Sequence, residues 1–357
     1  MIYEFYAETM YRISVKASCR DINNLLDRAD LTVFARVQLL AQALAASNRT
    51  KNCAQTGERS DRPGGLRKLI EDKTLDGYFE MQHEAFLEPL SLKTACPDIS
   101  IFPADSWALK FKFTLRKPYI SRDDTDFYIL DNPVKKEKVF KVPYVAPSQW
   151  KGALRSAMVL ELIKDSPLPE DFAQRRFRMA VLFGDEKGEE PGSIKGLAKY
   201  LDEKGGGEAA DQYRQLVKQC FNGDPDESLP HHKGVLHFYP TYFDQIGLGV
   251  INPHQRDTGA GKLPIYFECV PDGAEGNFTL LYVPLRGPEL SDEDAKKQAS
   301  QDLEVVAEGI RAMMILYGFG AKTSSGFGVA KVNDIDATIM PEEFLNIWQD
   351  AWLEDVE

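Results

Sequence analysis

The segment from Tyr317 to Val329 combines residue types that suit phosphate binding. It holds four glycines, Lys322 and three consecutive hydroxyl residues. Glycine leaves the backbone bare for close approach to an anion, and lysine and hydroxyl groups donate hydrogen bonds to phosphate oxygens. Phe319 and Phe327 can anchor the segment or stack on a base. The alternative interpretation of the whole segment is a β-hairpin turn with glycine bulges. The residues predicted to contact RNA here are Gly318, Gly320, Lys322, Thr323, Ser324, Ser325, Gly326, Phe327 and Gly328.

A second segment places cations at the start of an expected helix. Residues 148–163 have apolar side chains at helical spacing, and Ser148 follows Pro147 as a plausible N-cap. Lys151 and Arg155 lie one turn apart near the positive end of the helix dipole, where cations are unfavourable. A docked phosphate would offset that cost, although a plain surface pair is an equally simple explanation. We therefore predict Ser148, Lys151 and Arg155 as RNA-binding residues.

Length and composition describe a large globular chain. Its 357 residues, 43% of them apolar, suggest two domains or one domain with sizeable insertions. There is neither an apolar run of membrane-spanning length nor a recognisable signal peptide, so we expect a cytoplasmic protein with no membrane partner. The five cysteines are far apart in the sequence, which fits free thiols in a reducing compartment and argues against a zinc ribbon.

The net charge of −12 is unevenly distributed. Residues 107–155 contain eleven Lys and Arg against five Asp and Glu, whereas residues 332–357 contain eight acids and no base. A basic surface on an acidic body is typical of a subunit that holds RNA on one side and contacts partner subunits elsewhere.

The order of predicted elements indicates an α+β fold. Residues 1–105 look like an N-terminal extension, with a helix at 32–46 and a polar loop, partly disordered, at 48–68. A core follows at 106–332, with an inserted region at about 185–230, and residues 333–357 form an acidic C-terminal helix. The succession strand-helix-strand-strand-helix-strand within the core is that of a ferredoxin-like sandwich.

The two motifs together resemble those of the RAMP superfamily of CRISPR-associated proteins, in particular the backbone subunits of type III effector complexes. The first motif spans Pro143 to Arg155 and departs slightly at Pro147, Gln149 and Trp150; the second is the glycine-rich loop. The resemblance covers about residues 107–332. It implies a ferredoxin-like (RRM-like) RAMP core, and it implies guide RNA, complementary target RNA and other effector-complex subunits as partners.

The resemblance also implies a candidate catalytic residue. In the target-cleaving subunits, an aspartate in a short Asp-x-Pro motif is needed for divalent-metal-dependent cleavage of target RNA, and Asp131 matches it. A loop carboxylate can hold Mg²⁺ or act as a base on a 2′-hydroxyl, which makes Asp131 both the catalytic and the metal-binding candidate. A local Asx turn at Asp131 is the alternative. Asp126 is the second choice among the neighbouring aspartates, which include Asp123 and Asp124.

A polar stretch at 252–262 falls where such subunits carry a hairpin between guide and target. His254, Arg256 and Lys262 are therefore predicted to contact RNA, although His254 could equally be an exposed loop residue.

Three functions are compatible with the sequence: a cleaving subunit that is a metal-dependent endoribonuclease, a non-catalytic guide-binding subunit, and a free-standing endonuclease that processes precursor guide RNA. The third commonly relies on histidine, and the five histidines here form no evident catalytic group.

Overall fold

The computed structural model describes residues 18–44, 48–57, 63–92, 96–122, 129–130, 132–165, 167–186, 188–190, 193–221, 223, 228–252, 264–285, 291–332 and 337–353. Helices and antiparallel sheets both contribute to the structure, so the predicted α+β class is confirmed. Within these residues, no helix is both long and apolar enough to cross a membrane.

One antiparallel sheet lies at the centre of the chain. Its strands pair in the order β10–β1–β9–β5, and β11 also pairs with β1. The strands are β1 (Trp107–Leu115), β5 (Leu236–Phe238), β9 (Glu275–Tyr282), β10 (Ala330–Val332) and β11 (Thr338–Met340). Alternate residues of β1, from Trp107 to Leu115, point to one buried face, as the apolar-polar alternation of this segment predicts.

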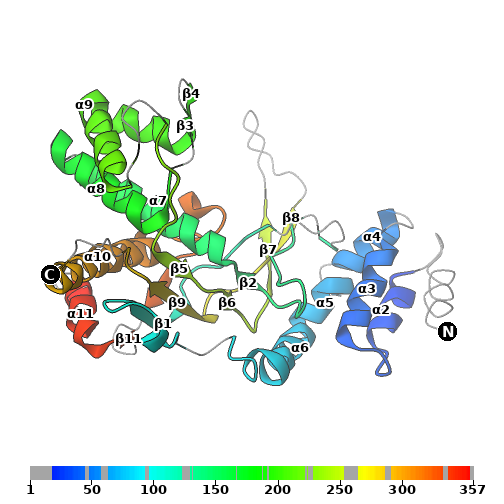
Figure 1. Cartoon of the computed structure of the whole chain (residues 1–357). Coiled ribbons are helices and arrows are strands. Elements are labelled where there is room, and N and C mark those ends of the chain that lie inside the picture. The colour runs from blue at the N-terminus through cyan, green and yellow to red at the C-terminus, as the bar shows by residue number, and fades with distance from the viewer. Residues whose placement is uncertain are drawn as a thin grey trace.

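Helices α7 (Pro147–Asp165), α10 (Asp292–Ala312) and α11 (Leu345–Leu353) cover the apolar face of this sheet (Figure 1). Trp150 of α7 contacts Phe113 and Phe278 with ring centroids 5.9 and 5.0 Å apart. Trp348 of α11 stacks on Phe111 at 5.2 Å. Full burial of a large apolar side chain contributes about 1.5–3 kcal/mol, so these rings fix both helices on the sheet. The chain order of the core is β1–α7–β5–β9–α10–β10.

Among the described residues, three two-stranded sheets lie outside the central one. They pair β2 (Tyr144–Val145) with β6 (Thr241–Tyr242), β3 (Glu189–Glu190) with β4 (Ser193–Ile194), and β7 (Gly247–Ile251) with β8 (Ile265–Cys269). The last pair forms the base of the hairpin predicted around residues 252–262.

A buried ion network holds α8 (Pro169–Phe183) against α9 (Gly196–Cys220). The Arg176 side chain is fully buried and donates two hydrogen bonds to Glu186, at 3.0 and 2.8 Å, and one to Asp202, at 2.7 Å. Arg214 also donates to Asp202, at 2.6 Å, and the Arg176 guanidinium lies 4.0 Å from the ring centre of Tyr213. Helix α9 is longer than the short helix that its sequence predicts, and it is interrupted by a kink at residue 206.

The N-terminal region is a group of short helices. They are α2 (Cys19–Leu26), α3 (Val33–Ala43), α4 (Asn48–Gln55), α5 (Gly65–Glu71), α6 (Thr74–Gln82), the π-helical turn η1 (His83–Leu87) and the 3-10 turn η2 (Ile99–Ile101). The helix predicted at 32–46 is confirmed over residues 33–43 as α3, and residues 45 and 46 lie outside the described part of the chain. The loop predicted at 48–68 is wrong, because α4 and the start of α5 occupy much of it.

Packing overrides the polar composition of this segment. Thr50, Cys53 and Ala54 of α4 are fully buried against neighbouring helices. Gly65, with φ of +60°, begins α5 so close to α4 that a side chain there would lie less than 3.0 Å from the Ala54 carbonyl oxygen. Glycine is therefore needed for the close approach of the two helices, and it does not mark an open loop.

Cys19 and Cys53 form a disulfide that joins α2 to α4, with their Cα atoms 5.0 Å apart. The prediction of free thiols is therefore wrong for this pair, because packing brings together two residues that are 34 positions apart in the sequence. Cys96, Cys220 and Cys269 are free.

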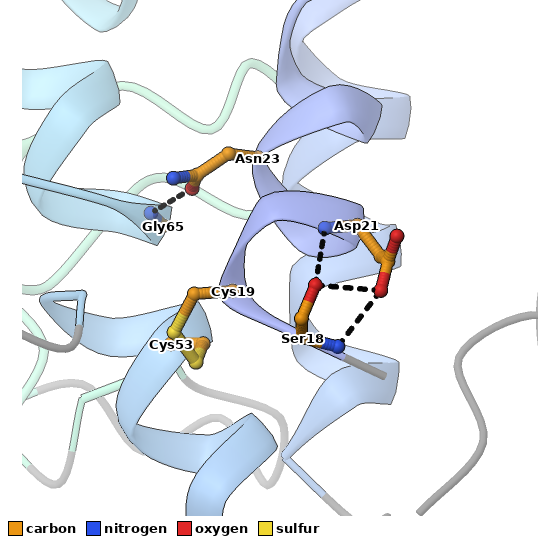
Figure 2. The surroundings of a disulfide bond; sticks show 6 residues. All are labelled: Ser18, Cys19, Asp21, Asn23, Cys53 and Gly65. Atoms are coloured by element: carbon orange, nitrogen blue, oxygen red, sulfur yellow. Dashed lines mark hydrogen bonds between the residues drawn. A yellow bond between two sulfur atoms is a disulfide. The ribbon is translucent and has the colours of Figure 1, made fainter. Parts of the chain in front are cut away.

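Figure 2 shows how polar groups order the same helices. Ser18 caps α2: its Oγ accepts a hydrogen bond from the Asp21 N–H at 3.3 Å, and the Asp21 carboxylate accepts one from the Ser18 N–H at 2.8 Å. This reciprocal pair is a capping box. Asn23 Oδ1 accepts from the Gly65 N–H at 3.2 Å, which ties the start of α5 to α2.

Side-chain hydrogen bonds connect the N-terminal helices to the loop that precedes α7. Gln55 donates to the Ile129 carbonyl at 2.7 Å, and the Tyr78 hydroxyl donates to the Phe140 carbonyl at 3.3 Å. Burial raises the pKa of Tyr78. The helices thus pack directly beside the segment that contains position 131.

Candidate nucleic-acid interface

The first turn of α7 is held by Gln149. The helix begins at Pro147, so the exposed Ser148 lies inside the first turn and the prediction of Ser148 as the N-cap is wrong. Gln149 Oε1 accepts hydrogen bonds from the Ala146 N–H at 3.0 Å and from the Tyr119 hydroxyl at 3.3 Å, and its Nε2 donates to Ser121 Oγ. These bonds satisfy a backbone donor at the helix end and orient the turn, which leaves the Ser148 hydroxyl outside the capping bonds.

The predicted cations occupy the first turns of α7. Lys151 and Arg155 are half-buried, and no described residue forms an ion pair or side-chain hydrogen bond with Arg155. Lys151 is close enough to β5 to affect His237: burial and the Lys151 charge together lower the pKa of His237. Sequence reasoning gave His237 no role, because the position of β5 beside α7 is a tertiary feature.

Three glycines of the glycine-rich loop are required by packing. Gly318, Gly320 and Gly328 have φ of +72°, +94° and +73°, and a side chain at each would lie less than 3.0 Å from a backbone oxygen. The Gly328 N–H donates to the Pro118 carbonyl at 3.0 Å. The loop therefore folds tightly on itself and on the residues 118–120 that follow β1, and this packing requires glycine at the three positions.

The loop tip presents unpaired donors. Thr323–Ser325 form one 3-10 turn (η4) between Lys322 and Gly326, both in the left-handed conformation, with φ of +58° and +80°. Lys322, Ser324 and Ser325 are exposed. Within the described part of the chain, the three hydroxyls have no hydrogen-bond partner. The tip can therefore donate several hydrogen bonds to an anion.

Phe319 joins the loop to α7. It is buried, and its ring centroid lies 4.4 Å from that of Trp150, 5.5 Å from Tyr119 and 5.7 Å from Phe113. Of the two roles open to it, Phe319 is thus an anchor. Because Trp150 precedes Lys151 directly, this contact brings the two predicted motifs together at one place on the molecule.

A second bond joins the base of the loop to α7. The Tyr317 hydroxyl donates to Glu161 Oε1 at 2.5 Å, and this hydrogen bond raises the pKa of Tyr317 to about 12. Tyr317 ends the π-helical turn η3 (Met313–Tyr317) that follows α10. The loop is thus held to α7 both near its first turn and further along the helix.

The β7–β8 hairpin base lies against the other side of the loop. Phe267 of β8 lies opposite Gly249, contacts the half-buried Phe327 edge-on at 6.3 Å, and has Lys322 Nζ 6.0 Å from its ring centre. A side chain at position 249 would overlap the Phe267 ring. The base of the hairpin therefore lies beside the glycine-rich loop.

Several predicted residues lie outside the described part of the chain: Asp131, Asp126, His254, Arg256 and Lys262. Their roles stay predictions. The same holds for the neighbouring Asp123 and Asp124.

The segment that follows position 131 is described, and it is fixed to β8. The Glu268 N–H donates to the Asn132 carbonyl at 2.9 Å, and Glu268 Oε2 accepts from the Val134 N–H at 3.1 Å and from Lys136 Nζ. Glu268 is only 4% exposed. The described segment from Asn132 to Lys136 is therefore attached to β8.

The predicted Mg²⁺ has no cluster of ligands among the described residues. No group of three or more His, Cys, Asp or Glu side chains there could hold a metal ion. Asp131 and Asp126 lie outside the described residues, so the metal site stays a prediction.

The chain belongs to the RAMP superfamily: the family model matches residues 126–331, which is more than half of the sequence. The match spans both motifs and the helices α7 and α10. No curated protein matches the sequence.

Two solved structures are similar over much of their length. A chain of the type III-B Cmr-beta complex bound to cognate target RNA is 13% identical, with 90% of this chain and 97% of the other covered and a TM-score of 0.40. Cmr6 from Pyrococcus furiosus is 16% identical, with 64% and 98% covered and a TM-score of 0.28. At these values, neither likeness carries an argument about function.

Proposed function

We propose that this protein is a subunit of a type III CRISPR ribonucleoprotein and holds the backbone of the guide RNA. The observation that carries the proposal is the contact between Trp150 and Phe319, which brings the cations of α7 and the donors of the glycine-rich loop to one place. Membership of the RAMP superfamily supports it. We further infer that the central sheet with α7 and α10 is the ferredoxin-like core, since its chain order and strand order follow that pattern.

The chemistry of the interface favours binding without regard to sequence. Lys151, Arg155 and Lys322 supply charge, and the hydroxyls at the loop tip supply further donors to phosphate oxygens. Contacts of this kind position a nucleic acid but do not read its bases. The acidic remainder of the chain weakens RNA binding by the lone subunit, so partner subunits complete the binding surface.

The proposal extends to cleavage of the paired target RNA through Asp131. A divalent cation, when bound, would stabilise charge at the scissile phosphate. Asp131 would hold that cation or accept a proton from the attacking 2′-hydroxyl. The attachment of residues 132–136 to Glu268 supports the positioning of this aspartate, because it fixes one end of the segment that carries it.

Charge reversal tests guide binding. In the assembled complex, Lys151→Glu with Arg155→Glu should weaken guide binding for all sequences alike and lower the salt slope by about 0.7 per lost phosphate contact on a single strand. Lys164→Glu is the matched control, since Lys164 is exposed at the far end of the same helix. Unchanged affinity and salt slope in the double variant would refute the assignment.

A second experiment tests cleavage separately. Asp131→Ala should abolish cutting of complementary target RNA in Mg²⁺ while target binding is retained, because a group that acts on the transition state contributes little to ground-state affinity. Asp126→Ala is the matched variant. Full cutting by Asp131→Ala would mean either that Asp126 is the catalytic residue or that this subunit only binds the guide and does not cut. If cutting is undiminished in the presence of a chelator, the cleavage does not need a divalent cation.

One observation keeps the processing endonuclease as a second candidate. His237, with a lowered pKa, lies beside Lys151 at the interface, and nucleases of that kind commonly use histidine. If the lone chain cuts precursor guide RNA in chelator, and His237→Ala abolishes the cut, the protein is a processing enzyme. No cutting under those conditions removes this candidate.

A further inference from the structure

A cavity of about 230 Å³ lies between the N-terminal helices and the loop before α7. Helices α3, α5 and α6 supply its apolar wall, which includes the aromatic side chains of Phe34, Tyr78 and Phe79. Ile129 and Pro133 form part of the opposite wall. The cavity is separate from the interface formed by α7 and the glycine-rich loop, whose residues do not line it.

Charged residues line one side of this cavity. Lys136, Lys138, Lys141 and Glu268 are among the residues that surround it. Lys136 is paired with Glu268, whereas no described residue forms an ion pair or side-chain hydrogen bond with Lys138 or Lys141. A ligand in the cavity would thus meet an apolar, aromatic interior and two unneutralised ammonium groups.

The volume restricts the ligand to one ring system. An apolar cavity of about 150 Å³ admits benzene, whereas pockets for drug-sized ligands start at about 300 Å³. Phe34, which is 39% exposed, and Tyr78 offer flat surfaces on which such a ring can stack. The lysines favour an anionic group attached to the ring and lying at the cavity mouth.

Among the described residues that line the cavity, Glu268 is the only one with an acidic side chain. Glu268 Oε2 receives hydrogen bonds from Val134 and Lys136, and no described residue donates to Glu268 Oε1. A heteroaromatic ring that carries N–H groups can use such an acceptor, but a plain hydrocarbon ring cannot.

We propose that this cavity binds a single unpaired nucleotide, with its base against Phe34 and Tyr78 and its phosphate on Lys138 and Lys141. A base joined to a phosphate meets all three requirements: a flat ring, N–H donors and an anionic group. The nucleotide can be a free mononucleotide or one residue of a single-stranded RNA, and the chemistry of recognition is the same. The proposal does not depend on guide binding at α7.

The first experiment measures binding of free ligands to the purified full-length chain by calorimetry. AMP, GMP, CMP and UMP are compared with adenosine, inorganic phosphate and hexanoate. Lys138→Gln with Lys141→Gln should weaken nucleotide binding about tenfold or more, and Phe34→Ala about 5- to 100-fold through lost stacking. Lys164→Gln is the matched control, and unchanged thermal unfolding shows that each variant is folded.

The second experiment distinguishes the two sources. A short single-stranded RNA that contains 4-thiouridine is photocrosslinked to the chain, with and without excess mononucleotide. Crosslinks at Phe34 or Tyr78 that the mononucleotide displaces identify an RNA residue as the ligand, whereas mononucleotide binding without such crosslinks identifies the free form.

Three results would overturn the proposal. The first is that no nucleotide, free or within RNA, binds in a way that the cavity variants affect. The second is that adenosine binds as tightly as AMP, which would exclude the lysines. The third is that hexanoate competes equally, which would make the cavity an unspecific apolar one. Because Ala41 lines the cavity on α3, Ala41→Phe fills it and provides an independent check: like Phe34→Ala, it should weaken nucleotide binding.

Discussion

Gly328→Ala and Gly326→Ala form a matched pair that tests whether the glycine-rich loop depends on its internal packing. Both glycines have positive φ, +73° and +80°. They differ in their surroundings. A side chain at 328 would overlap the backbone of Phe319, whereas a side chain at 326 has open space around it, with nothing within 4 Å.

The expected magnitudes follow from these surroundings. Alanine at 326 carries only the cost of a left-handed conformation, about 1–2 kcal/mol. Alanine at 328 carries that cost and must also displace backbone, which weakens the hydrogen bonds from Phe319 N–H to Gly328 O, at 3.1 Å, and from Gly328 N–H to Pro118 O, at 3.0 Å. At about 0.5–1.5 kcal/mol for each bond, the total for Gly328→Ala is about 2–5 kcal/mol.

The assay is urea unfolding of the full chain together with RNA binding by the assembled complex. Gly328→Ala should lower the free energy of unfolding clearly more than Gly326→Ala does, and it should also weaken RNA binding because Phe319 no longer holds the loop on Trp150. Equal losses of stability for the two variants would refute the argument that close packing, and not conformation alone, selects glycine at 328.

Two further predictions concern buried charges. Arg176→Met leaves the buried Glu186 without its arginine partner and Asp202 with only Arg214, and it should cost about 3–5 kcal/mol. Arg214→Met, at a more exposed position, should cost much less. Hydrogen exchange in α9 measures both losses, and equal effects would contradict the network. Burial raises the pKa of Asp302 to about 6. A raised carboxyl pKa stabilises the folded state at low pH, and that contribution is lost as the pH rises from about 4 through about 6. In Asp302→Asn, the amide still accepts from the Tyr282 hydroxyl but does not titrate. The free energy of unfolding of this variant, measured with urea, should therefore rise by about 1–3 kcal/mol relative to that of the native chain as the pH increases from about 4.5 to about 7.5. A difference between the two chains that stays constant over this range would contradict the prediction.

Local patterns predicted the elements that carry the interface. The alternation of β1, the helical spacing of α7 and the glycine content of the loop are properties of neighbouring residues, and each element is present as predicted. The association of α7 with the loop through Trp150 and Phe319 could be expected from the family resemblance but not from the residues themselves, since aromatic contacts across 169 positions leave no local signal.

Tertiary packing explains the errors. The polar stretch that forms α4 and α5 is helical because one face of it is buried, and the pairing of Cys19 with Cys53 follows from that packing. Ser148 is not the cap because Gln149, three positions after Ala146, reaches back to the Ala146 N–H. The helical state of α4 and α5, the disulfide pairing and the identity of the capping residue all depend on which residues lie nearby in the folded chain. The linear order of residue types does not give that information.

The contact between Trp150 and Phe319 also determines when the interface can exist during synthesis. A ribosome that has released residues up to 300 has already produced α7 with Lys151 and Arg155, but it has not yet produced the loop or β10, which pairs with β1. Until that segment is made, β1 pairs with β9 but not with β10, and Trp150 lacks the contact with Phe319. Contacts this distant in sequence form late. Only a chain that extends through the glycine-rich loop can therefore present both halves of the interface, so the proposed RNA binding would select such chains over shorter ones.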